Sequence, residues 1–68
     1  MIEVDARGLS CPEPLMLADQ AMKAHPGEPV RVLVTEAHAR TNVEKFGRSK
    51  GRTVETKEVG QEYEIVIK

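Results

Sequence analysis

This sequence is poor in the residues that staple or stiffen small domains. Its 68 residues include one cysteine, one phenylalanine, one tyrosine and no tryptophan. A single cysteine cannot form an internal disulfide, and one thiol with two histidines is a poor ligand set for a structural zinc site. We therefore expect a core of aliphatic side chains, and we expect neither a metal nor another cofactor.

Charge and hydropathy argue against two further classes of protein. The formal net charge is −1, whereas dedicated nucleic-acid binders are usually clearly basic. No apolar run approaches the ~20 residues of a membrane-spanning helix. The opening residues, MIEVDARG, lack the basic region and apolar core of a signal peptide. Because a free thiol also suits a reducing compartment, we expect a cytoplasmic protein without membrane or nucleic-acid partners.

The hydrophobic pattern predicts one domain over residues 1–68 with an α+β fold. Alternating apolar residues predict strands, and apolar residues at helical spacing predict helices. In chain order we expect a strand at 2–6, a helix at 12–25, a strand at 30–35, a helix at 37–50, and strands at 53–59 and 62–68. The expected architecture is a two-layer α/β sandwich, β-α-β-α-β-β, with a mixed four-stranded sheet and both helices on one face.

Cap and turn residues predict where several of these elements end. Gly51 suits the left-handed cap after the second helix, and Thr35 is a candidate N-cap before it. The Gly60-Gln61 step between the last two strands suits a type II′ hairpin. Helical spacing places the following residues on the buried face of the first helix, in line with Cys11: Leu15, Ala18, Ala21, Met22 and His25.

The only cysteine, Cys11, stands directly before Pro12-Glu13-Pro14. Proline is favoured at the first helical position and tolerated within the first turn, so Cys11 should lie at or just before the helix N-terminus. The helix dipole favours a thiolate there and lowers the thiol pKa from about 8.5. Because the prolines lack amide hydrogens, the Glu13 N–H is the expected donor to the sulfur. The Glu13 carboxylate would oppose a thiolate, and Arg7 would support one.

Few thiol reactions suit this set of residues. A cysteine protease needs a histidine base against the sulfur, and His25 should lie about 21 Å further along the same helix. Disulfide exchange of the thioredoxin kind needs a second cysteine, which is absent. The remaining chemistry is a thiol that accepts a group from one partner and passes it to another, for which a persulfide is the natural cargo. The alternative is that Cys11 is a small buried core residue.

The stretch DARGLSCPEPLM resembles the Cys-Pro-x-Pro signature of the TusA/SirA-like sulfur carriers, and the similarity extends over essentially the whole chain. The resemblance implies a two-layer β-α-β-α-β-β sandwich in which Cys11 carries the persulfide sulfur and Pro12 and Pro14 shape the helix start. It also implies an acceptor protein and a separate sulfur donor, such as a cysteine desulfurase, a rhodanese-like protein or a small persulfide.

The second predicted helix resembles one branch of this family. ARTNVEKFGRSKG is similar to the matching stretch of YedF-type selenium-metabolism proteins. Tus-type carriers instead have an Asp-Ile-Pro step where this chain has Asn42-Val43-Glu44, which argues against tRNA thiolation as the pathway. The resemblance supports chalcogen handling and leaves open the choice between sulfur and selenium. It also leaves open whether this is a stand-alone protein or half of a two-domain chain, as YedF-type proteins usually are.

Two other residues are candidates for partner docking or thiolate support. Met16 should be an exposed apolar residue on the polar face of the first helix. Arg40 begins a basic series on the second helix, which either docks an acidic partner or is an ordinary solvated face. An RNA reader of the KH type would need a Gly-x-x-Gly clamp, which is missing, as are stacking aromatics. The main rival function is a regulatory or docking module that kept the fold; an RNA-binding module ranks below it.

Overall fold

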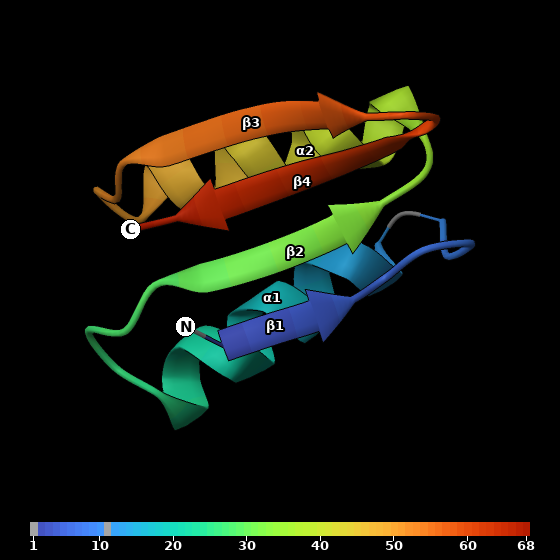
Figure 1. Cartoon of the computed structure of the whole chain (residues 1–68). Coiled ribbons are helices and arrows are strands. Elements are labelled where there is room, and N and C mark those ends of the chain that lie inside the picture. The colour runs from blue at the N-terminus through green and yellow to red at the C-terminus, as the bar shows by residue number, and fades with distance from the viewer. Residues whose placement is uncertain (1, 11) are drawn as a thin grey trace.

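The computed structural model describes residues 2–10 and 12–68, so Met1 and Cys11 lie outside the described residues. Its elements follow the predicted order, with bounds close to the predicted ones (Figure 1). They are β1 (Ile2–Asp5), α1 (Glu13–Ala24), β2 (Val30–Val34), α2 (Ala37–Ser49), β3 (Val54–Val59) and β4 (Glu62–Ile67).

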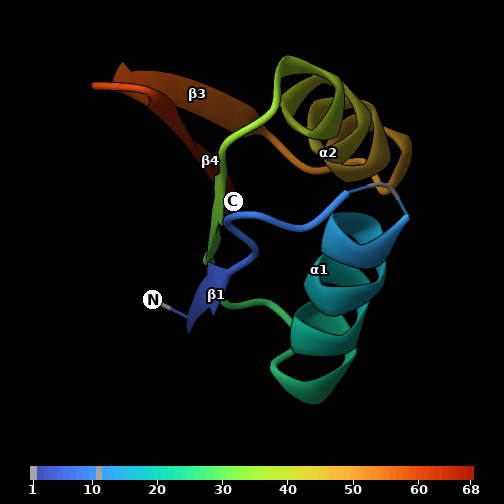
Figure 2. The same ribbon diagram turned by 90° about the vertical axis from the view of Figure 1, so that its right-hand side faces the viewer.

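The strands form one mixed four-stranded sheet in the order β1-β2-β4-β3. β1 pairs with β2 in parallel, whereas β4 is antiparallel to both of its neighbours, β2 and β3. Both helices cover the same face of this sheet, and none of the described elements covers the other face (Figure 2). The predicted two-layer sandwich is therefore confirmed, with β2 as a central strand.

The core is aliphatic, as the shortage of aromatic residues predicted. Alternate residues of β2 point between the layers, which gives this strand a strictly alternating burial pattern. Phe46 and Tyr63 only pack against the edge of the buried cluster. Among the described residues, the buried hydrophobic side chains are Ala6, Ala18, Val30, Val32, Val34, Ala39, Val43, Ile65 and Ile67.

Both ends of α1 differ from the sequence prediction. The helix begins at Glu13, so Pro12 is the N-cap residue and not the first helical residue. The Pro12 carbonyl accepts the first helical hydrogen bond from the Met16 amide at 3.1 Å, as an N-cap carbonyl does. His25, predicted on the buried face, is exposed because the helix ends at Ala24 and the backbone of His25 leaves the helical conformation.

The two ends of α2 differ in how well they were predicted. The predicted cap at Gly51 is confirmed, since Gly51 has φ +75° and its amide donates to Arg48 O at 2.9 Å. Arg52 N–H donates to Gly47 O at 3.2 Å and completes a Schellman motif. The prediction of Thr35 as N-cap is wrong, because Glu36 holds that position and no side chain caps the helix.

The β3–β4 hairpin has the predicted two-residue turn. Val59 pairs with Glu62 across Gly60-Gln61, and Gly60 has φ +61°. Among the described residues, positive φ angles are confined to glycines, so Gln61 has a negative φ. This combination of signs is that of a type II′ turn, which requires glycine only at its first central position.

Candidate functional site

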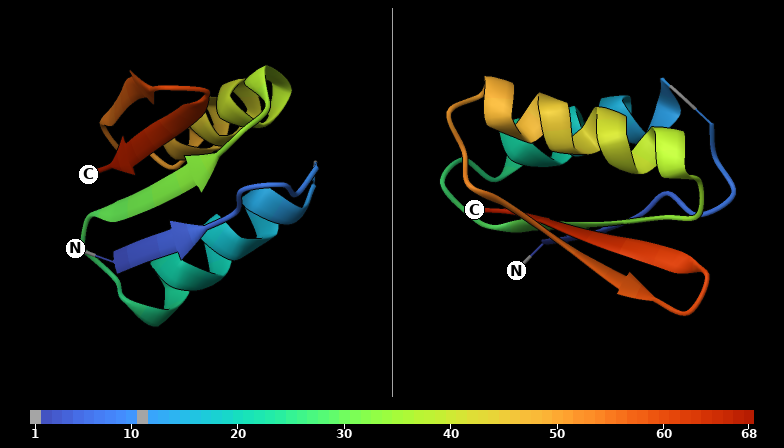
Figure 3. Two further views of the ribbon diagram at one scale, coloured as in Figure 1. Left: turned by 45° about the vertical axis from the view of Figure 1, so that its right-hand side comes forward. Right: turned by 90° about the horizontal axis from the view of Figure 1, so that it is seen from above.

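The segment around Cys11 belongs to one end of the molecule, where several loops meet. β1 and β2 are parallel, so their carboxyl ends lie at the same edge of the sheet. Both helices begin at this end, and the β3–β4 hairpin turns there (Figure 3). The carboxyl ends of parallel strands are the usual place for a ligand or reaction site in α/β sheets. We therefore treat residues 6–16 and the loops beside them as the candidate site.

The predicted reactive residue, Cys11, lies outside the described residues, and its placement stays a prediction. Its chain neighbours Ser10 and Pro12 are both exposed. The Glu13 amide donates to Ser10 O at 3.0 Å. Whether this amide also donates to the sulfur of Cys11 depends on a residue outside the described ranges, so that expectation stays a prediction.

The residues that lead into this segment form a tight turn. The Leu9 amide donates to Ala6 O at 3.2 Å, which closes a β-turn. Gly8 is the third residue of this turn and has φ +80°, the conformation that a type II turn requires there. The buried Ala6 donates its own amide to Leu33 O of β2 at 2.9 Å, so the turn is anchored on the sheet.

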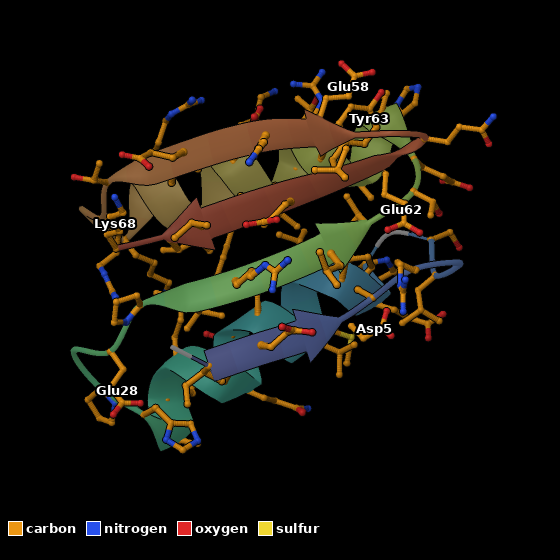
Figure 4. All side chains as sticks on the ribbon, in the orientation of Figure 1. Asp5, Glu28, Glu58, Glu62, Tyr63 and Lys68 are labelled. Atoms are coloured by element: carbon orange, nitrogen blue, oxygen red, sulfur yellow. The ribbon has the colours of Figure 1, made fainter. Side chains whose placement is uncertain are left out.

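Arg7, the predicted support for a thiolate, is held by two carboxylates. Its guanidinium lies 2.8 Å from Asp5 Oδ2 and 3.3 Å from Glu62 Oε2 at the start of β4. The side-chain hydrogen bond from Arg7 lowers the pKa of Asp5 to about 2, and the same bond raises the pKa of Arg7 above its usual value. Figure 4 shows Asp5 and Glu62 at the same end of the sheet. Much of the charge of Arg7 is thus already balanced.

The two prolines and Met16 lie on different sides of the start of α1. Pro14 is the second helical residue and is buried, whereas Pro12 is exposed. Met16 is 55% exposed, as predicted. It borders a surface hollow of about 220 Å³, which we call the α1 hollow, lined by Leu9, Glu13, Met16, Leu17 and Gln20. A mainly apolar hollow therefore adjoins the segment that carries Cys11.

Arg40 takes part in a separate contact between α2 and β4. Its guanidinium carbon lies 5.2 Å from the centre of the Tyr63 ring, and Nη1 lies 3.4 Å from the Glu44 carboxylate. Its Nε is buried without a hydrogen-bond partner in the described part of the chain. The hydrogen bonds and ion pairs described for Arg40 do not reach residues 6–10 or 12–16, so its proposed role toward Cys11 stays a prediction.

The two histidines lie far apart in the described structure, at opposite ends of the helical layer. Residues 2–10 and 12–68 contain no group of three or more His, Cys, Asp or Glu side chains that could hold a metal ion. His25 lies past the end of α1, 3.7 Å from Glu28, whereas His38 lies in the first turn of α2 at the other end of the layer. No helix in the described ranges is long and apolar enough to cross a membrane.

Sequence reasoning missed two residues that hold the turn before Cys11. Thr35 Oγ1 accepts a hydrogen bond from the Gly8 amide at 3.1 Å, and Glu62 pairs with Arg7 from 55 residues away. The contact of Thr35 with Gly8 could have been expected from the sequence. Thr35 directly follows β2, and the end of β2 adjoins the end of β1. Glu62 carried no such signal, because its position depends on the register between β2 and β4.

Comparisons with known proteins agree with this geometry. A family model described as sulfurtransferase TusA matches residues 2–68. The crystal structure of a SirA-like protein from Desulfitobacterium hafniense is similar with a TM-score of 0.91 and 30% sequence identity, covering 98% of this chain and 95% of that one. A search of curated proteins finds no match. The predicted resemblance to the TusA/SirA-like group is thereby confirmed.

Proposed function

Because the chain belongs to the TusA sulfurtransferase family, we propose that it carries sulfane sulfur as a persulfide on Cys11 and passes it to a partner protein. The observation that supports this proposal best is the setting of the only cysteine in the sequence. Its neighbours Ser10 and Pro12 are exposed, at the end of the sheet where the turn at residues 6–9 and the start of α1 are both held by hydrogen bonds. An exposed, well-anchored segment suits a thiol that must meet two partners in turn.

The proposed transfer is a displacement at sulfur. The Cys11 thiolate attacks the outer sulfur of a persulfide on the donor and forms a new S–S bond. The S–S bond of the donor breaks, and the donor leaves as a thiolate. This thiolate takes up the proton that the Cys11 thiol lost when it ionised. In the second transfer Cys11 is the leaving thiolate and an acceptor nucleophile takes the sulfur. No external oxidant or reductant is needed, because the oxidation level of the sulfane sulfur passes along with the atom.

The local charges support a moderately activated thiol. The start of α1 places the positive end of a helix dipole next to residue 12 in the chain, and a thiolate is favoured near such an end. Glu13 carries an opposing negative charge, and Arg7 shares its positive charge with Asp5 and Glu62. We propose that the pKa of the Cys11 thiol is modestly lowered from about 8.5, without the extreme shift of some redox enzymes.

The α1 hollow is the proposed docking place for the donor and the acceptor. Met16 is exposed at its border, and Leu9 and Leu17 supply further apolar surface. A partner could insert an apolar side chain there and bring its own reactive group to Cys11. The proposed donor is a separate protein, such as a cysteine desulfurase or a rhodanese-like protein. We propose that this relay takes place in the cytoplasm.

The test is intact mass spectrometry of the reduced protein after incubation with a cysteine desulfurase and cysteine. We expect the mass to increase by one or more sulfur atoms and to return to its original value with a reductant. The Cys11→Ser variant, treated in parallel, should gain nothing. A selenium donor in place of cysteine then asks whether selenium is also accepted. Failure of several donors to modify the wild-type protein would refute the carrier role.

The exposed α1 hollow also suits a second function, in which the domain docks on a partner without transferring sulfur. The two functions differ in their need for the thiol. A docking module retains its activity in the Cys11→Ser variant, whereas a carrier loses sulfur delivery and keeps partner binding. Measuring binding and delivery for the wild-type protein beside this variant therefore separates the two, because only a carrier delivers sulfur as wild type and loses that delivery in the variant.

A further inference from the structure

The turn before Cys11 is held to the end of β2 by a side chain. The Gly8 amide donates a hydrogen bond to Thr35 Oγ1 at 3.1 Å, between residues 27 positions apart. Thr35 directly follows β2, and Gly8 lies three residues before Cys11. The hydrogen bond therefore links the ends of the two parallel strands at the candidate site.

Thr35 completes a continuous set of hydrogen bonds along this turn. Each amide from residue 6 to residue 9 has an acceptor, and the acceptors come from β1, β2, the turn itself and Thr35. They are Leu33 O for Ala6, Asp5 Oδ1 for Arg7, Thr35 Oγ1 for Gly8 and Ala6 O for Leu9. Removing the Thr35 hydroxyl would leave the Gly8 amide without its acceptor in a turn that is otherwise fully paired.

The Thr35 hydroxyl does not stabilise the helix that follows it. A threonine at the start of a helix commonly accepts a hydrogen bond from the first turn. Here Glu36 is the N-cap residue of α2, and no side chain caps that helix. The hydroxyl accepts a hydrogen bond from Gly8 instead, so Thr35 stabilises the turn that leads to Cys11.

We propose that Thr35 is a positioning residue for Cys11. By holding the Gly8 amide, it sets the direction in which the chain leaves the turn toward Ser10 and the start of α1. This inference rests on the proposed role of Cys11 as the sulfur-bearing group, but Thr35 itself touches no sulfur in this scheme. Its effect on the thiol passes through the backbone of the turn.

The experiment compares three variants with the wild-type protein. Thr35→Val keeps the size and branching of the side chain and removes the hydroxyl, whereas Thr35→Ser keeps the hydroxyl. Thr41→Val is the matched control, because the Thr41 hydroxyl donates to Ala37 O at 3.1 Å, a hydrogen bond that lies within α2. For each protein we would measure Gly8 amide exchange, thermal unfolding, and the rate of Cys11 alkylation by iodoacetamide from pH 6 to pH 10.

We expect Thr35→Val to speed exchange of the Gly8 amide about fivefold, the factor that corresponds to one ordinary neutral hydrogen bond. Alkylation of Cys11 at neutral pH should slow about threefold, and its pH midpoint should move toward the value of about 8.5 for an unperturbed thiol. Thr35→Ser should restore both properties. Thr41→Val should leave both unchanged, and its thermal unfolding reports the general cost of losing a hydroxyl.

Three results would overturn the proposal. The first is a Gly8 amide that exchanges at the same rate in Thr35→Val and wild type. The second is faster exchange with an unchanged alkylation profile, since Thr35 would then hold the turn without affecting the thiol. The third is failure of Thr35→Ser to restore the profile.

The Thr35→Val variant could fail to fold, and the remaining proteins then decide. A Gly8 amide that is unprotected from exchange in the folded wild-type protein would contradict the proposal. A Gly8 amide that is protected both in wild type and in Thr35→Ser would support it. Since none of these measurements uses a sulfur donor, a failed sulfur-loading experiment refutes the carrier role separately.

Discussion

Individual side chains at the end of the sheet connect segments that are distant in the sequence. Arg7 joins β1 to the first residue of β4 through Asp5 and Glu62. Thr35 joins the end of β2 to Gly8. Both contacts converge on the turn at residues 6–9, so the position of the segment that carries Cys11 depends on side chains from three strands or strand ends.

The Asp5–Arg7 pair predicts a pH dependence of stability. Folding lowers the pKa of Asp5 from 3.8 to about 2, so the stabilisation is fully present above pH 3.8 and is lost as the pH falls through about 2. We expect Asp5→Asn to flatten the dependence of urea unfolding on pH within this window. The effect should be small, because both side chains are exposed and screened by solvent.

A double-mutant cycle provides the control for this prediction. Arg7→Gln removes the partner of Asp5 and should flatten the pH dependence of urea unfolding in the same pH window. The double variant Asp5→Asn/Arg7→Gln should then behave like either single variant, because the pair is already broken in each. Additive effects of the two substitutions would show that the pair is not the source of the pH dependence.

At the scale of elements, close packing of α2 on the sheet depends on a glycine within the helix. Gly47 is buried, and a Cβ added there would lie 2.6 Å from Val54 Cγ2 and 3.2 Å from Ile67 Cγ1. The neighbouring side chains are β-branched and adjust poorly at χ1. The absence of a side chain at Gly47 therefore lets α2 lie directly on β3 and β4.

Gly47→Ala sets two effects of opposite sign against each other. Alanine is favoured over glycine within a helix by about 1 kcal/mol, whereas overpacking a tight contact costs about 1–3 kcal/mol. We expect a net loss of about 1 kcal/mol in the free energy of unfolding, measured in urea. Gly47→Ala in a Val54→Ala background removes the nearest contact and should cost less or stabilise. If Gly47→Ala alone were more stable than wild type, α2 would be free to move away from β3 and β4.

At the scale of the whole molecule, the two faces of the sheet have separate roles. One face packs the helices and the aliphatic core, and the other is covered by charged side chains paired across strands, such as Arg31 between Glu3 and Glu64. The candidate site lies at the end of the sandwich, beside the α1 hollow on the helical layer. A partner that docks on this layer therefore approaches Cys11 without contacting the open face.

A pair of substitutions tests this assignment of faces. Met16 and Val59 are exposed large hydrophobic residues, at 55% and 49%, on the helical layer and on strand β3 respectively. We expect Met16→Lys to slow sulfur transfer from a donor protein at least tenfold, while loading from a small persulfide and thermal stability stay unchanged. Val59→Lys, the matched control, should leave all three unchanged. Equal slowing by both variants would argue against docking at the α1 hollow.

Much of the architecture was predictable from local pattern. Alternation in β1, the apolar run of β2 and the helical spacing around Val43 each report burial directly, because side-chain direction follows the local backbone period. Gly51 and Gly60 were predictable for the same reason, since the positive φ angles of these two glycines are local requirements of a cap and a turn. The Cys-Pro-Glu-Pro step likewise marked the start of α1 to within one residue.

Several hydrogen-bond and ion-pair partners were decided only in the folded chain. The hydroxyl of Thr35 had two available amide partners, the first turn of α2 and Gly8, and the adjacency of the strand ends selected Gly8. Glu62 reaches Arg7 because the register of β4 against β2 brings the hairpin to the end of β1. The Glu13 amide bonds to Ser10 because the turn closes before the helix begins. Hydrophobic period is a property of neighbours in sequence, whereas these partners were chosen by strand register and by the competition of acceptors for each amide.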